Sequence, residues 1–260
     1  MLLEICVDSV ESAVTAERGG AQRIELCSDL LEGGITPSPG LLELVRKRLQ
    51  IDIFVMIRPR GGDFCYTAEE FAVMKADIQY AKRLGADGVV LGILNADGYV
   101  DVPRTKELVE LANPLPVTFH RAIDVSIDFA DSLERIIASG AQRVLTSGGK
   151  RRVIDSIQRI SDAIDLARDR ITIMAGGGLS PENIRMVAEG TGAAEYHASL
   201  NTRISSPVRH RNHSLFLGLN MDREYSRYVV REEDVRALRG ELDWVDGERS
   251  STAQNAVNDA

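Results

Sequence analysis

Three features that mark particular classes of protein are missing from this sequence. The chain has only three cysteines in 260 residues, an odd number that predicts no disulfide framework and favours reduced thiols in the cytoplasm. No apolar run approaches the roughly 20 residues needed to cross a bilayer, and residues 1–8 lack the basic region of a signal peptide. The net charge of −8 argues against a general nucleic-acid surface. We therefore expect a cytoplasmic protein that binds neither membranes nor nucleic acids.

The common short metal-binding motifs are missing as well. The sequence contains no Cys-x-x-Cys, His-x-His or His-Glu-x-x-His pattern. A zinc hydrolase is therefore weakly supported.

What the chain does contain is a dipeptide repeat. Gly-Ala occurs four times just ahead of a short apolar run, and the glycines are separated by 65, 55 and 52 residues. Each interval is about twice the length of one strand-plus-helix unit, and glycine commonly ends a helix ahead of a strand. The apolar runs that follow are residues 23–27, 88–92, 143–147 and 195–199. Four double units predict a (β/α)8 barrel of the TIM type, a fold that nearly uses up a chain of this length.

The remaining elements fit between these runs. Further strands are expected at residues 2–8, 52–58, 116–121 and 171–176. Helices are expected at 67–84, where Thr67 and Glu70 form a capping box, from Ser180 onward, and at 231–242. Residues 201–223 are polar and predict a long loop. We expect one domain over residues 1–242 and a polar, disordered tail over 243–260.

Alternation along the strands predicts which side chains face the barrel interior. One face of each strand is apolar and suits packing under the helices. The opposite face carries five charged or titratable residues: Glu4, Glu25, Arg58, His120 and His197.

These five residues have two interpretations. A buried charge must be paired, so Arg58 is expected to contact Glu25 or Glu4, and the set could be a structural salt-bridge cluster. Barrel active sites lie at the carboxyl ends of strands, which instead favours a catalytic set of Glu25, Arg58, His120 and His197, with the histidines as acid and base.

Glycine-rich strand ends predict an anion site. Ser147, Gly148 and Gly149 end one strand, and Gly176, Gly177 and Gly178 end the next, ahead of the helix expected at Ser180. Glycines let backbone amides approach a phosphate, and a helix N-terminus favours negative charge. Together with Arg58, these residues would hold a small anionic or phosphorylated molecule.

The thiols give a third possibility. Cys6 and Cys27 share the interior-facing parity on neighbouring strands, and Cys65 lies in the loop after the next strand. Thiolates suit Cu(I), although a buried free cysteine is usually just a small apolar residue.

At these residues the chain resembles the CutC copper-homeostasis family. The similarity runs from residues 4–8 to 197–199, and its most specific block is residues 56–66, Met-Ile-Arg-Pro-Arg-Gly-Gly-Asp-Phe-Cys-Tyr. The resemblance implies a cytoplasmic barrel, often a homodimer, with a role in copper handling or Cu(I) binding. We expect Cu(I) to bind through Cys27 and Cys65, with Cys6 as a further ligand. The alternatives are a barrel enzyme acting on a small anion and a non-catalytic oligomeric scaffold.

Overall fold

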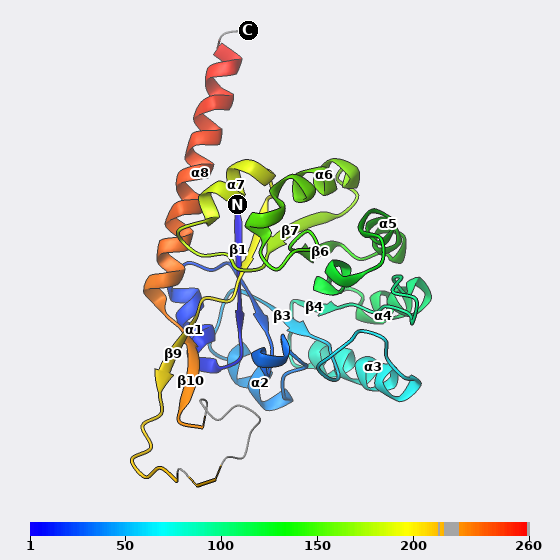
Figure 1. Ribbon diagram of the computed structural model, residues 1–260, viewed down its shortest axis with the longest axis vertical. Coiled ribbons are helices and arrows are strands. Elements are labelled where there is room, and N and C mark those ends of the chain that lie inside the picture. Colours follow the sequence, from blue (N-terminus) through cyan, green and yellow to red (C-terminus); the bar gives the residue numbers. More distant parts are fainter. Residues whose placement is uncertain (213, 216–223, 259–260) are drawn as a thin grey trace.

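Eight parallel strands close into a barrel in the computed structural model, which describes residues 1–212, 214–215 and 224–258 (Figure 1). The strands pair in sequence order, and β8 closes the sheet against β1. They are β1 (Leu2–Val7), β2 (Arg23–Leu26), β3 (Asp52–Met56), β4 (Gly88–Leu91), β5 (Val117–Phe119), β6 (Arg143–Thr146), β7 (Thr172–Gly176) and β8 (Glu195–Ala198). The predicted (β/α)8 barrel is confirmed, and each of the four Gly-Ala pairs leads into an even-numbered strand.

Helices surround the sheet on its outer face. They are α1 (Val10–Arg18), α2 (Pro39–Arg46), α3 (Ala68–Arg83), α4 (Val102–Ala112), α5 (Phe129–Ser139), α6 (Ile157–Ala167), α7 (Ile184–Thr191) and α8 (Glu232–Asn258). The predicted capping box at α3 is confirmed, because the Thr67 side chain accepts from the Glu70 N–H and Glu70 accepts from the Thr67 N–H. The helix expected from Ser180 instead begins at Ile184, since residues 181–183 form a turn that leads into it.

Two features of the C-terminal part of the chain were not expected. The segment expected to be a loop, residues 201–223, begins with a strand, β9 (Asn201–Ser205), which pairs antiparallel with β10 (Ser226–Val230) just beyond that segment. Residues 213 and 216–223 lie outside the described residues. The closing helix does not end at Leu242. It continues to Asn258, through most of the segment expected to be disordered, and its last turns extend beyond the barrel in Figure 1. No helix in the described residues is both long and apolar enough to cross a membrane.

The alternation of side chains along the strands creates two buried regions, one between the sheet and the helices and one inside the barrel. Leu3, Ile5 and Val7 of β1 point outward and are fully buried beneath the helices. Glu4 and Cys6 point into the barrel, where strand register sets their neighbours: Glu4 lies level with Arg23 and His197, and Cys6 lies level with Glu25. The inward-facing residues therefore form layers, and the layer nearest the carboxyl ends of the strands borders the site.

Candidate active site and thiol cluster

A cavity of about 310 Å³ opens at the carboxyl ends of the strands. Four of the five residues expected to face the interior line it, and Glu4 lies beneath them. The other lining residues come from the strand ends and from the loops that follow them. The complete lining is Cys6, Glu25, Leu30, Glu32, Gly33, Met56, Arg58, Phe64, His120, Arg121, Leu145, Gly177, Gly178, His197, Ser199 and Asn201.

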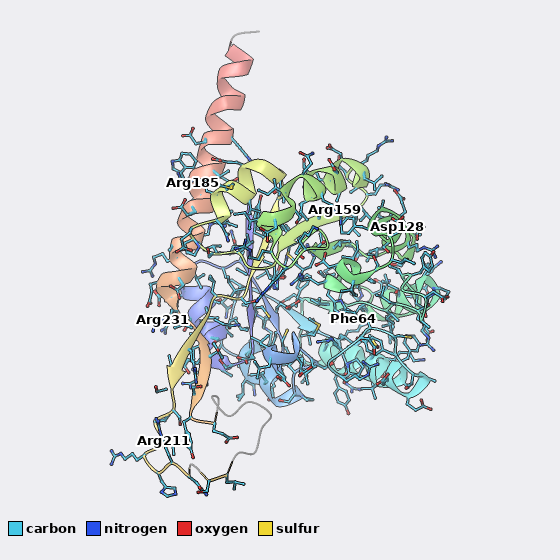
Figure 2. The ribbon with its side chains drawn as sticks, viewed as in Figure 1. Phe64, Asp128, Arg159, Arg185, Arg211 and Arg231 are labelled. Carbon is cyan, nitrogen blue, oxygen red and sulfur yellow. The ribbon has the colours of Figure 1, made fainter. Side chains whose placement is uncertain are left out.

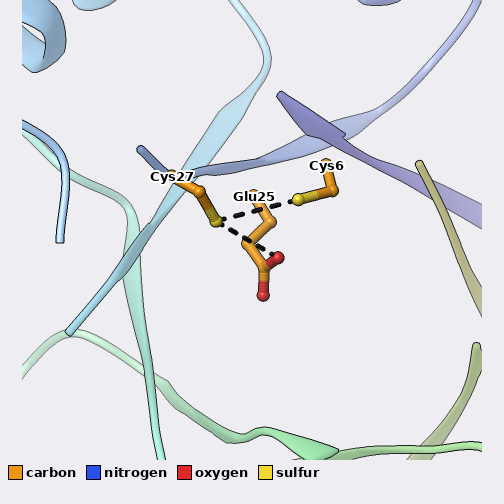
Figure 3. A group of neighbouring side chains, drawn as sticks. All are labelled: Cys6, Glu25 and Cys27. Atoms are coloured by element: carbon orange, nitrogen blue, oxygen red, sulfur yellow. Dashed lines mark hydrogen bonds between the residues drawn. The ribbon is translucent and has the colours of Figure 1, made fainter. Parts of the chain in front are cut away.

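Two thiols and a carboxylate meet beside this cavity (Figure 3), and two of the three residues, Cys6 and Glu25, line it. The Cys6 and Cys27 sulfur atoms lie 3.7 Å apart, and the Cys27 thiol donates to Glu25 Oε2 at 3.5 Å. All three side chains are buried, and their potential ligand atoms lie within 4.8 Å of one another. The three residues form a compact donor set of the kind that holds a metal ion.

Burial keeps these thiols protonated. The shared hydrogen bond with Cys27 and the loss of water raise the pKa of Cys6 well above its usual value. For Cys27, the hydrogen bond from Cys6 lowers the pKa. Burial and the nearby Glu25 charge outweigh this effect and raise the pKa to about 12. A metal ion bound by these thiols must therefore displace their protons.

His197 connects this cluster to the layer beneath it. Its Nδ1 lies 2.7 Å from Glu4 Oε1, and its Nε2 lies 3.9 Å from Glu25 Oε2. Burial lowers the pKa of His197, but Glu25, Cys6 and Glu4 together raise it well above its usual value. Burial raises the pKa of Glu25 despite the nearby imidazolium. His197 is therefore an imidazolium that lies between two carboxylates, and it is not free to act as a general base.

Glu4 is the buried anchor of this network. Burial alone would raise its pKa, but the Arg23 charge and the His197 hydrogen bond lower it to about 2. The Arg23 side chain forms ion pairs with Glu4 and Glu195, and Arg143 also pairs with Glu195. Each charged side chain in the lower part of the barrel interior is therefore paired with one of opposite charge, as buried ions require.

The partner of Glu4 is Arg23 and not Arg58, so the expected Arg58 pairing is wrong. Arg58 follows the end of β3, and its guanidinium donates to three main-chain carbonyls: Glu32 and Gly34 from Nη1, at 2.6 and 2.8 Å, and Gly62 from Nη2, at 2.9 Å. It also lies over the ring of Phe64, 5.1 Å from the centroid (Phe64 is labelled in Figure 2). Arg58 thus ties two loops together at the rim of the cavity.

His120 is buried in its neutral form. Burial and the charge of Arg58 lower its pKa to about 3. Its Nδ1 accepts the Ala122 N–H at 3.2 Å, which places the ring proton on Nε2. Gly92 permits this position, because a Cβ there would lie 2.5 Å from the ring. His120 is therefore a hydrogen-bond donor at neutral pH and not a proton acceptor.

The glycine turn after β6 is closed to anions. The Ser147 and Gly149 amides donate to the Asp124 carboxylate, and the Gly148 amide donates to Thr146 Oγ1. The prediction that Ser147, Gly148 and Gly149 bind an anion is therefore wrong, because a carboxylate of the chain already occupies their amides. Gly177 and Gly178 do line the cavity, whereas Gly176 belongs to β7.

Cys65 does not join the other thiols. Its side chain is exposed and is not part of the cavity lining. Its loop turns outward because Arg60 holds the Cys65 carbonyl while Asp63 accepts its N–H. The structure therefore brings Cys27 together with Cys6 and not with Cys65.

Comparisons with known proteins agree with the resemblance seen in the sequence. The model of the CutC family matches residues 1–202. The chain belongs to the CutC family. It is 50% identical to the mouse copper homeostasis protein cutC homolog over 92% of this chain and 87% of that protein, and 49% identical to the human homolog over 91% and 87%. The structure of CutC from Streptococcus agalactiae aligns with a TM-score of 0.73 at 34% identity, covering 76% of this chain and 97% of that one.

The family match covers the whole barrel and every residue that lines the cavity. Most of the β9–β10 hairpin and all of α8 lie beyond it. The cavity is therefore built entirely from the part of the chain that matches the family.

Sequence reasoning missed two residues that organise this part of the barrel. Arg23 shares the strand parity of Glu25 and Cys27, so its inward orientation was available from the alternation. Asp124 lies in a short 3₁₀ helix after β5 and accepts hydrogen bonds from the next strand end. No alternation applies to such a segment, and its role depends on tertiary contacts.

Proposed function

We propose that the protein binds Cu(I) through the Cys6 and Cys27 thiolates and takes part in copper homeostasis. The observation that carries this proposal is the pair of buried sulfur atoms 3.7 Å apart beside the Glu25 carboxylate. Soft thiolate ligands favour Cu(I) over harder divalent ions. The names of the mouse and human relatives agree with this role.

The sulfur separation favours a bent site. With metal–sulfur bonds of about 2.3 Å, a linear site needs sulfurs about 4.6 Å apart. At 3.7 Å the same bonds enclose an angle of about 107° at the metal. A bent pair leaves room for a third ligand, and the candidate beside both sulfurs is the Glu25 carboxylate.

A Cu(I) site of this kind requires reduced thiols, and a reducing compartment such as the cytoplasm supplies them. Both cysteines are free thiols in the structure. The homodimer implied by the resemblance remains a prediction, which sedimentation velocity would test.

Competition with a chromophoric Cu(I) chelator under anaerobic, reducing conditions tests the proposal. We expect one Cu(I) per chain in the wild type and in Cys65→Ser, the matched control with its exposed thiol. Cys6→Ser and Cys27→Ser should each lose at least tenfold in affinity, because one remaining sulfur cannot form the pair. Equal affinity in all four proteins would reject the site.

A further inference from the structure

The cavity contains polar groups that the copper proposal does not use. Three buried side-chain atoms in its lining residues have no hydrogen-bond partner among the described residues: His120 Nε2, Arg58 Nε and Glu25 Oε1. Buried polar atoms are nearly always paired. Three unpaired atoms in the residues that line one cavity point to a ligand that completes it.

His120 supplies a fixed donor. Its ring is held from the other side by the Ala122 N–H, so Nε2 must carry the proton. Phe64 packs against the same ring, with the centroids 4.9 Å apart. This donor suits an oxygen acceptor.

Arg58 supplies an uncompensated positive charge. Its side chain is buried and uses three N–H groups on main-chain carbonyls, while Nε lacks a partner. In the described part of the chain, no carboxylate lies within 4.0 Å of its nitrogens. Arg23, the other buried arginine of the described residues, has two carboxylate partners. A buried cation without a counter-ion favours a negatively charged ligand.

Arg58 and His120 act on the same region of the cavity. Both contact the Phe64 ring, and Arg58 is close enough to lower the pKa of His120. Phe64 lies on the loop after β3, where a ring can move aside more readily than on a strand. Movement of this ring would expose both groups to a ligand.

Glu25 faces the cavity from β2 with one oxygen unpaired. A ligand hydroxyl can either donate to this oxygen or accept from it. The remaining walls include Leu30, Met56 and Leu145, which are apolar. At about 30 Å³ per water-sized group, a cavity of about 310 Å³ holds roughly ten non-hydrogen atoms.

We propose that this cavity binds a small hydroxycarboxylate, with its carboxylate between Arg58 and His120 and a hydroxyl on Glu25. Two donor groups match the two oxygens of a carboxylate. A phosphoryl group is less well matched, because the amides of the β6 turn are already bound to Asp124 and Thr146. This inference shares Glu25 with the copper proposal, but the groups that would bind the carboxylate, Arg58 and His120, are not part of the thiol cluster.

Thermal-shift and calorimetric titrations with glycolate, lactate, malate and citrate test this proposal, with glycerol and inorganic phosphate as comparison ligands. We expect a saturable rise in melting temperature with at least one hydroxycarboxylate, none with glycerol, and a weaker effect with phosphate. A ligand that binds the native state must raise the melting temperature. No saturable response to any of the four acids, or a response to phosphate that equals the best of them, would overturn the proposal.

Variants locate the binding site. His120→Asn keeps an acceptor for the Ala122 N–H but is too short to present the donor, and Arg58→Lys keeps the charge but loses the fork of donors. Each should weaken binding at least tenfold, whereas Arg60→Lys, on the exposed neighbouring loop, should not. The Cys6→Ser, Cys27→Ser double variant should retain binding, which separates this site from copper. Circular dichroism identifies any variant that fails to fold, and unchanged affinity in either folded cavity variant would contradict the assignment.

Discussion

His197 Nδ1 lies 2.7 Å from Glu4 Oε1, within the layer of the barrel interior that lies beneath the thiol cluster. On its other side Glu4 is paired with Arg23, so one buried carboxylate holds two cations. The thiol cluster and the cavity both lie directly above this network of buried charges. The stability of the barrel should therefore be sensitive to Glu4.

We predict that Glu4→Gln lowers the free energy of unfolding by about 3 kcal/mol, because it leaves buried cations without their counter-charge. Urea denaturation measures the change. The matched control is Glu43→Gln, which removes an exposed carboxylate whose partner is Lys47 and should change the free energy of unfolding very little. A loss at Glu4 no larger than at Glu43 would show that the network is solvated.

His120 should make the protein sensitive to acid. Its pKa falls from an ordinary value of 6.5 to about 3 on folding, so between these values the unfolded state binds more protons and stability falls as pH falls. At pH 5 the cost is about 2 kcal/mol, at 1.36 kcal/mol per pH unit below 6.5. His197 has a raised pKa and acts in the opposite direction, since it loses stabilisation only as pH rises above 6.5.

The difference between wild type and His120→Asn isolates this effect, because other titrating groups cancel. Melting temperatures measured from pH 7 to pH 5 should fall less in the variant. Parallel curves for the two proteins would mean that His120 is accessible to protons in the folded state.

Copper affinity should rise with pH. Both thiols are protonated at neutral pH, and the pKa of Cys27 is about 12. Binding of Cu(I) as a dithiolate therefore releases about two protons. Competition titrations from pH 6 to pH 8, corrected for protonation of the chelator, should give a slope near two in log affinity against pH; a flat profile is incompatible with a dithiolate site.

Gly92 should be needed to hold His120 in place. A Cβ at position 92 would lie 2.5 Å from the imidazole, so Gly92→Ala should displace the ring and cost about 1–3 kcal/mol. Gly40→Ala is the control, because a Cβ there meets nothing within 4 Å and Gly40 lies in α2. That substitution should be neutral or stabilising, since alanine favours helix over glycine; equal effects at the two positions would argue against the tight contact.

The sequence was sufficient for the barrel because the evidence for it is local. Gly-Ala pairs mark helix ends, and alternation assigns the inward faces, including Glu25 and His197. The partners of Arg58 were not predictable in this way. Its contacts are main-chain carbonyls of two loops, and carbonyl positions depend on how those loops close rather than on residue identity.

The anion and copper predictions failed in part for the same reason. The β6 turn has the glycines that an anion site requires, but Asp124 from another loop occupies its amides. Cys65 is near Arg58 in the sequence, but its loop directs it outward. Cys6 lies in β1 and Cys27 directly follows β2, and both were placed correctly because strand parity determines where they point.

The central claim is that Cys6 and Cys27 bind Cu(I), and X-ray absorption at the copper edge tests it most directly. The sample is the Cys65→Ser variant loaded with one equivalent of Cu(I), because this variant lacks the exposed thiol. Binding between Cys6 and Cys27 predicts two sulfur neighbours at about 2.3 Å, the usual metal–thiolate distance, together with one oxygen neighbour from Glu25. A copper ion with one sulfur neighbour, or with none, would contradict the account.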